Sequence, residues 1–312
     1  LLLDVQRRDW SAALLDQLGV ARSQLPPVQP SADAVGTLLP HVAAELGLPS
    51  AIPVVAGAAD TACSMLAAGA TQPGTLLLTL STGGQLVLPV AQPTVDLAGR
   101  IHTFCGALAP DSGYAGWYQM GAILSAGMAL QWLRDAVLGL SDEEAFARMS
   151  VWAATSPPGA DGLIFLPYLA GERTPHMDPT ARGAFLGLSL GHGRSDLVRA
   201  VMEGVAFAIL DALTVLVELG ATPAEIVLAG GGARSALWRQ IIADIFALPV
   251  KPLEISEQSA VGASLLAGLG AGVVDAAAIP AQWAHYGAPS LPDPANHSRY
   301  AERHAQLNRG EV

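Results

Sequence analysis

Asp60 is the one charged residue in the segment VVAGAADTACSML, which begins at Val54. The segment predicts a short buried strand that ends in small residues, followed by a helix that Asp60 opens. Ligands of open α/β sheets bind beyond the carboxyl ends of the strands, so this carboxylate could act as a general base or hold a metal ion through water. The alternative is that Asp60 only caps the helix, since free N–H groups at a helix N-terminus stabilise a carboxylate.

Two glycine-containing turns could bind an anion. In LSTGGQ, Ser81, Thr82 and Gly83 lie between two apolar runs, a pattern typical of a β-hairpin. In VLAGGGARSALWRQ, residues 230–232 are all glycine and lie between a predicted strand and a predicted helix. Small residues let backbone N–H groups approach a phosphate, although an ordinary turn explains either segment alone. The spacing is not G-x-G-x-x-G, which disfavours a dinucleotide site of the Rossmann type.

Other polar residues are interpreted as structural. Glu172, Arg173 and His176 in GERTPH are expected to form an ion-pair loop, and Glu203 is expected to pair across its domain. The chain has neither a G-x-S-x-G nucleophile motif nor a Gly-rich P-loop, and its one lysine is Lys251. A bound nucleotide would therefore need a different kind of phosphate site.

Alternating strands and helices must position these residues, which indicates an α/β fold. We expect a hairpin over residues 74–90, a strand and a helix on either side of the glycine turn, and long helices over 121–138 and 195–219. A boundary between domains is predicted near residues 71–75, where helix gives way to hairpin.

The composition narrows the class of protein. Hydrophobic residues make up 51% of the 312 residues and charged residues 14%, so most of the chain must be buried. The net charge of −11 argues against nucleic acid or an anionic membrane as partner. Neither of the two long uncharged runs is a continuous apolar segment of the kind that crosses a membrane. The two cysteines lack the spacing of a metal site, which fits a reducing cytoplasm. The first residues, LLLDVQRRDW, show no signal-peptide pattern and read as an entry in mid-strand, so we expect the later part of a longer protein.

Four segments, in this order, resemble the FGGY carbohydrate kinases, and most closely the xylulokinase branch. VAGAADTACSMLAAGATQPGTLLLTLSTGGQ is similar to the segment that holds the family's catalytic Asp and its phosphate hairpin. The segment from Phe165, FLPYLAGERTPHMDPTARGAFLGLSLGHGRSDLVRAVMEGVAFAI, is similar to the family's central signature. LAGGGARSALWRQIIADIFALPV and EQSAVGASLLAG resemble its adenosine-binding segment and the helix that closes the nucleotide pocket.

The resemblance implies an actin-like, ribonuclease H-like ATPase fold of two domains with the site in the cleft. Residues 1–73 would be the C-terminal remnant of the sugar-binding domain, and residues 74–312 would be the nucleotide-binding domain. The family's Asp-Gly-Thr phosphate segment and most of its sugar contacts, which belong to the front of the first domain, are absent from this sequence.

The resemblance also implies roles for particular residues. Asp60 would be the general base for the sugar hydroxyl and a water-mediated Mg²⁺ ligand, beside Thr61 as a sugar contact. The remaining residues would contact ATP: Thr82 and Gly83 at the transferring phosphates, Gly231, Gly232 and Ala233 along the nucleotide, and Gln258 and Gly262 near adenine. Phosphoryl transfer is mostly positioning and charge stabilisation, which suits such a set of backbone groups and one carboxylate.

Two functions remain open at this stage. The first is ATP-dependent phosphorylation of a sugar, D-xylulose by resemblance, with this chain inactive alone; ribulose, glycerol and gluconate are the alternative substrates. The second is a nucleotide-binding module without activity. The family's Gly-Gly-Asp-Asn is Ala58-Ala59-Asp60-Thr61 here, and its Gly-Thr-Ser is Ser81-Thr82-Gly83. A homodimer is left open as the assembly.

Overall fold

A six-stranded mixed sheet forms the centre of the protein in a computed structural model, which describes residues 2–110 and 113–311. Its order is β12 (Val250–Pro252), β11 (Glu225–Ala229), β5 (Thr75–Leu80), β6 (Gly84–Val90), β8 (Trp117–Ile123) and β7 (His102–Cys105). The first three strands run parallel to one another, and the β5–β6–β8–β7 part is antiparallel. The expected α/β class is therefore confirmed.

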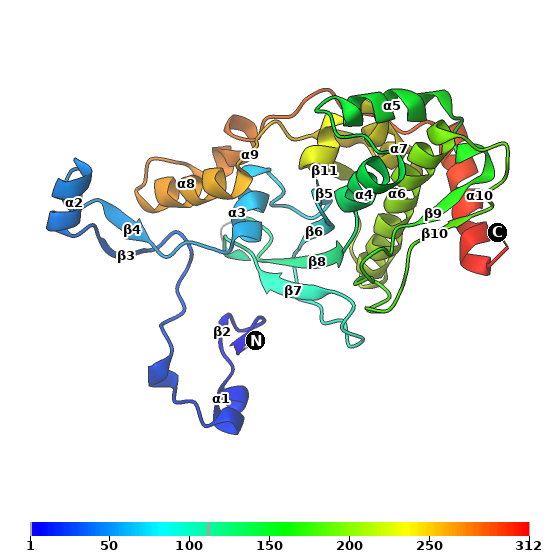
Figure 1. The fold of residues 1–312 in the computed structure, drawn as a ribbon. Helices are drawn as coiled ribbons and strands as arrows, with labels where there is room; N and C mark the ends of the chain where they lie inside the picture. Colours follow the sequence, from blue (N-terminus) through cyan, green and yellow to red (C-terminus); the bar gives the residue numbers. More distant parts are fainter. Residues whose placement is uncertain (1, 111–112, 312) are drawn as a thin grey trace.

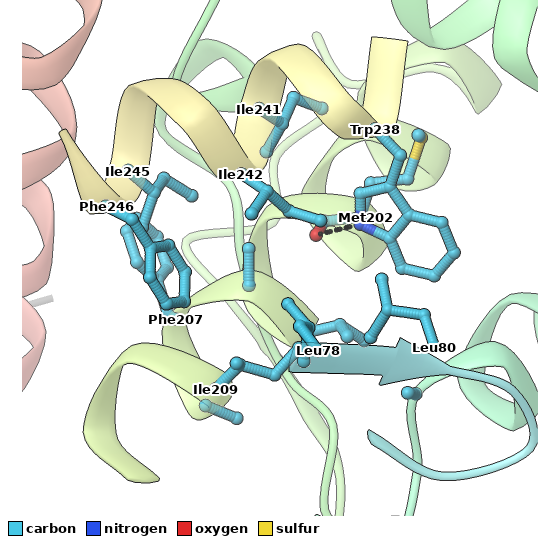
Figure 2. Close-up of a cluster of buried hydrophobic side chains, with 14 of the residues drawn as sticks. Leu78, Leu80, Met202, Phe207, Ile209, Trp238, Ile241, Ile242, Ile245 and Phe246 are labelled. Atoms are coloured by element: carbon cyan, nitrogen blue, oxygen red, sulfur yellow. Dashed lines mark hydrogen bonds between the residues drawn. The ribbon is translucent and has the colours of Figure 1, made fainter. Parts of the chain in front are cut away.

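The leucine run of β5 is apolar throughout because both faces of this strand are covered. Leu76, Leu78 and Leu80 point into the large core against α6 (Arg194–Glu218) and α7 (Ala236–Phe246), while Leu77 points to the opposite face. Figure 2 shows Leu78 and Leu80 below α7, with the indole of Trp238 donating a hydrogen bond of 3.0 Å to the Met202 carbonyl. This core fixes where β5 ends and its hairpin turn begins.

The remaining helices of that face lie around α6 in Figure 1. They are α4 (Gly127–Trp132) with the π-helical turn Leu133–Val137 that follows it, α5 (Ala145–Thr155) and α10 (Pro294–Arg309). A separate pair of strands, β9 (Ile164–Leu166) and β10 (Ala184–Leu186), lies beside them. The helix expected over 121–138 begins only at Gly127, because residues 117–123 continue the sheet.

Among the described residues, α6 is the one helix long and apolar enough to cross a membrane. Of its most apolar 18-residue stretch, 78% is buried within the protein. Its apolar length is accounted for by the core on which β5, α5 and α7 pack.

The opposite face of the sheet carries α3 (Asp60–Ala67), and α8 (Gln258–Gly270) packs on α3. Ala62 and Met65 of α3 join a core cluster with Val227 and Ala229 of β11. Ala229 is the last residue before the glycine turn, so α3 lies against the strand that leads into this turn. The short helix α9 (Ile279–Gln282) packs on α3 and α8 through Ile279.

The segment before α3 extends away from this body in Figure 1. It holds the strand pairs β1 (Leu3–Asp4) with β2 (Asp9–Trp10) and β3 (Ala34–Thr37) with β4 (Pro53–Val55), and the helices α1 (Ala12–Leu18) and α2 (Pro40–Leu46). The expectation of a buried strand before Asp60 is wrong, because β3 is the one described strand that pairs with β4 and Val54 is 44% exposed.

Candidate active site

Asp60 is the first residue of α3, and its side chain is exposed. The N-cap residue is Ala59, which has no side chain able to cap, so Asp60 stands one position inside the cap. Its Oδ1 accepts a hydrogen bond of 2.6 Å from the Thr61 N–H. The carboxylate is thus held at the helix N-terminus and open to solvent, and it carries no burial penalty.

Thr61 lies next to this carboxylate and is half-buried. Its hydroxyl donates a hydrogen bond of 3.4 Å to Asp60 Oδ1. This contact turns the hydroxyl towards the Asp60 carboxylate. A threonine offers one hydroxyl at this position, where an asparagine would offer an amide group with separate donor and acceptor atoms.

Residues 81–83 form the tip of the β5–β6 hairpin, as the sequence predicts. The tip is anchored by the first turn of α4: the N–H groups of Ala126 and Met128 donate to the Thr82 carbonyl at 3.1 and 3.0 Å, and that of Gly127 donates to the Ser81 carbonyl at 2.8 Å. Among the described residues, no atom accepts from the N–H groups of Thr82 or Gly83. These two N–H groups can therefore donate to a bound anion.

Gly83 has a second reason to be glycine. A Cβ at this position would lie 2.7 Å from the Ile123 carbonyl oxygen, so only a residue without a side chain lets the tip approach the end of β8. Close packing and anion approach thus require the same residue here.

The glycine turn lies directly against β5 at the base of this tip. Gly230 adopts φ +81°, which favours glycine, and a Cβ on it would lie 2.8 Å from the carbonyl carbon of Leu80. A Cβ on Gly232 would lie 2.7 Å from the Leu80 Cβ. Gly231 is exposed with no atom within 4 Å of a Cβ position, so its backbone is accessible to a ligand. Ala233 is buried, and its carbonyl accepts a hydrogen bond of 2.6 Å from Arg239.

Gln258 and Gly262 lie on α8, and Gly262 faces α3. Gln258 begins the helix, and its side-chain amide donates to the Ile255 carbonyl at 3.1 Å. A Cβ on Gly262 would overlap the Cys63 backbone, 2.8 Å from its Cα. The hydroxyls of Ser64 and Ser259 hydrogen-bond between the two helices at 2.9 Å. Gly262 therefore has a packing role, which fixes the position of the helix that carries Asp60.

The predicted site residues are thus brought together in two groups. The hairpin tip and the glycine turn meet at Leu80, and Asp60 with Thr61 shares the α3–α8 pair with Gln258 and Gly262. The two groups are linked through Ala62 and Ala229, which pack in one core cluster. Asp60 makes no hydrogen bond to the described residues of the tip or the turn.

The charge of Asp60 acts on its neighbours. Burial raises the pKa of Tyr118 to about 12, and the Asp60 carboxylate adds to this effect. Burial likewise raises the pKa of the Cys63 thiol, again with a contribution from Asp60. Both groups are therefore neutral beside Asp60 at physiological pH.

Glu172 was expected to form an ion pair with a neighbour in its loop, and this expectation is wrong. Its Oε1 accepts from the N–H groups of Leu124 at 2.9 Å and Arg173 at 2.7 Å, in a side chain that is 2% exposed. Burial raises the pKa of Glu172. His176 hydrogen-bonds the Tyr168 hydroxyl at 3.0 Å. A search of the sequence for opposite charges does not find backbone N–H donors, so the sequence could not predict these two hydrogen bonds to Glu172.

The expectation for Glu203 is confirmed. Its Oε1 accepts from Arg199 at 2.7 Å, from the Tyr300 hydroxyl at 2.7 Å and from the Gly159 N–H at 3.0 Å, joining α6, α10 and the loop after α5. It is a buried structural residue that holds these elements together.

The donor set for a metal ion is sparse. Among the described residues, no group of three or more histidines, cysteines or carboxylates could hold an ion. Asp60 is a single exposed carboxylate. This fits Mg²⁺ that is held mainly by nucleotide phosphates and water, since Mg²⁺ commonly takes only one or two protein carboxylates.

Comparisons with known proteins agree with the segments identified above. The C-terminal domain of the FGGY family of carbohydrate kinases matches residues 79–271, and the N-terminal domain of the same family matches residues 1–67. The xylulose kinase of Bacillus subtilis is 37% identical over 272 residues, 87% of this chain and 53% of the relative. The gluconokinase of the same organism is 32% identical over 283 residues, 88% of this chain and 54% of the relative.

A solved structure shares the whole arrangement. The crystal structure of xylulose kinase from Rhodospirillum rubrum superposes with a TM-score of 0.86 at 34% identity, covering 96% of this chain and 59% of that chain. The chain thus spans about half the length of the curated relatives that it matches. It belongs to the FGGY family of carbohydrate kinases and has the actin-like, ribonuclease H-like ATPase fold of that family.

Proposed function

We propose that this chain carries the general base and the nucleotide site of an ATP-dependent kinase that converts D-xylulose to D-xylulose 5-phosphate. The observation that carries the proposal is the hairpin tip, whose two free N–H groups adjoin the glycine turn while α3 presents Asp60 from the neighbouring face. The names of the xylulose kinase relatives support the choice of substrate. We place the boundary between the sugar-binding and nucleotide-binding domains at residues 73 and 74.

In the proposed reaction, Asp60 accepts the proton of the sugar hydroxyl that attacks the terminal phosphate of ATP. The N–H groups of Thr82 and Gly83 hold the phosphates, and Gly231 lets the nucleotide approach the backbone. Gly232 and Ala233 support this turn, and Gln258 and Gly262 lie towards the adenine. Bound with the nucleotide, Mg²⁺ would neutralise phosphate charge, with Asp60 as its water-mediated protein contact.

The identity of the sugar calls for a direct comparison of acceptors, because one relative is a gluconokinase. The family's asparagine is Thr61 here, and its hydroxyl hydrogen-bonds Asp60. Thr61 can therefore offer a sugar a hydroxyl but no amide group. Ribulose, glycerol and gluconate are therefore the alternative acceptors to be compared with xylulose.

We further propose that the 312-residue chain binds ATP but does not phosphorylate sugar. A general base needs its substrate held within hydrogen-bonding distance, and Asp60 is exposed, with β4 of the preceding segment also exposed. The rival is a module that binds nucleotide and has no catalytic role in any context.

Two assays separate these functions. Calorimetric titration of the chain with ATP and Mg²⁺ should give saturable binding, and an ADP-release assay of the same chain should show no dependence on xylulose. A chimera in which this chain replaces the matching half of the Bacillus subtilis relative should release ADP with xylulose, and less with ribulose, glycerol or gluconate. A chimera that folds and binds ATP without any sugar-dependent ADP release would favour the rival.

A further inference from the structure

Two cationic side chains have no hydrogen bond, ion pair or aromatic contact among residues 2–110 and 113–311. The chain has sixteen lysines and arginines, and fourteen of them form an ion pair, hydrogen bond or aromatic contact through the side chain. Arg173 and Arg234 form none with the described residues, and both are exposed. In a chain with 27 acidic residues, an arginine whose guanidinium forms no ion pair with a described carboxylate calls for another explanation.

The backbone of Arg173 lies beside the hairpin tip. The Arg173 N–H donates to Glu172 Oε1, and the same oxygen accepts from the Leu124 N–H. One residue further, the Thr174 N–H donates to the Ala122 carbonyl at 3.0 Å. The segment 172–174 is therefore fixed along the end of β8.

The end of β8 is also where the tip packs. A Cβ on Gly83 would lie 2.7 Å from the Ile123 carbonyl oxygen and 3.4 Å from that of Leu124. Leu124 thus contacts the tip on one side and the Glu172 carboxylate on the other. Arg173 follows this anchor directly, which places a long cationic side chain next to the tip.

The buried neighbours of Arg173 fix its backbone. Glu172 and Thr174 are buried at 2% and 3% exposure, whereas Arg173 between them is exposed. The two neighbours hold the backbone along the end of β8, while the guanidinium is left in solvent. A fixed backbone limits the region that this side chain reaches, which suits a group that meets phosphate at the tip.

Resting on the proposed kinase function, we propose that Arg173 binds the terminal phosphates of the nucleoside triphosphate at the hairpin tip. A guanidinium matches phosphate geometry with two parallel N–H donors, which the N–H groups of Thr82 and Gly83 would complement. The protein has a net charge of −11 and a single lysine, which is already bound to Glu225 at 2.5 Å, so a cation at the tip offsets the repulsion of a polyphosphate. Arg234 follows the glycine turn, on the other side of β5, where the nucleoside end is expected.

The test compares three variants of the 312-residue chain in calorimetric titrations with ATP and with AMP, at one fixed salt concentration. Arg173→Gln removes the charge, and Arg173→Lys keeps the charge but not the two parallel N–H donors of the guanidinium. Arg299→Gln is the matched control, because Arg299 is exposed on α10 and donates only to the Pro158 carbonyl. Each variant is first checked for an unchanged melting temperature.

Arg173→Gln should weaken ATP binding about 10- to 100-fold, the scale of a hydrogen bond between charged groups, and change AMP binding less than about twofold. Arg173→Lys should recover part of the loss, and Arg299→Gln should bind ATP like the unmutated chain. Unchanged ATP binding by Arg173→Gln, equal losses for ATP and AMP, or an equal loss in Arg299→Gln would each overturn the assignment. An unmutated chain that binds no ATP would contradict the proposed function itself.

Discussion

Gly262→Ala tests whether the α3–α8 contact sets the position of Asp60. The new Cβ would lie 2.8 Å from the Cys63 Cα and closer still to its carbonyl group, whereas non-bonded carbon atoms normally approach to about 3.5–4.0 Å. The three nearest atoms all belong to the backbone of Cys63 in α3, so no side-chain rotation relieves these overlaps. The two helices must therefore separate by about 1 Å, which opens the cluster around Cys63, Leu66 and Leu265.

The expected loss of stability follows from two opposing effects. Overpacking lowers the free energy of unfolding by about 1–3 kcal/mol, with a backbone clash at the upper end. Replacing glycine by alanine within a helix raises it by about 1 kcal/mol. The free energy of unfolding should thus fall by about 2 kcal/mol, and the melting temperature by about 4 °C.

Urea unfolding followed by circular dichroism measures this change. A second measurement is the reaction of Cys63 with a thiol reagent, which should accelerate because Cys63 is 3% exposed and lies under α8. Gly36→Ala is the control, since no atom lies within 4 Å of its Cβ position. If Gly262→Ala unfolds within 0.5 kcal/mol of Gly36→Ala, the spacing of the helices does not depend on this glycine.

Two further predictions concern buried charge and pH. Glu203→Ala leaves the buried Arg199 without its carboxylate and should lower the free energy of unfolding by about 3–5 kcal/mol in urea titrations; a change below 1 kcal/mol would refute a structural role for this pair. Hydrogen bonds from Arg100 hold the pKa of Asp96 below its ordinary value, so the native state loses this proton at a lower pH than the unfolded chain. Stabilisation by Asp96 is therefore present above about pH 4 and lost as the pH falls through its native pKa. Asp96→Asn should lower the urea midpoint at pH 7 and match the unmutated chain near pH 2, and a pH-independent difference would contradict this linkage.

Local patterns were enough to predict the β5–β6 hairpin and the two turns. The apolar runs around Ser81–Gly83 and the glycines after β11 each indicate their own turn, because a hairpin and a strand–helix turn depend on neighbouring residues. Asp60 was correctly predicted to open a helix, but its N-cap is Ala59.

Contacts between distant segments could not be predicted in this way. The anchoring of Glu172 by backbone amides joins residues 48 apart, and the contact of Gly262 with Cys63 joins two helices far apart in the chain. The burial expected of β4 also failed, since an apolar sequence shows that a strand can be buried but not whether another segment covers it.

The most direct test of the account is Asp60→Asn in the chimera with the Bacillus subtilis relative. Asn keeps the size of the side chain and an oxygen acceptor for the Thr61 N–H, so folding should be unchanged and ATP binding largely intact, while an amide cannot take the hydroxyl proton. Sugar-dependent ADP release should fall at least about 100-fold, the scale of general base catalysis, a far larger change than that in the dissociation constant of ATP. Turnover that survives this substitution would contradict the assignment of Asp60 as the base.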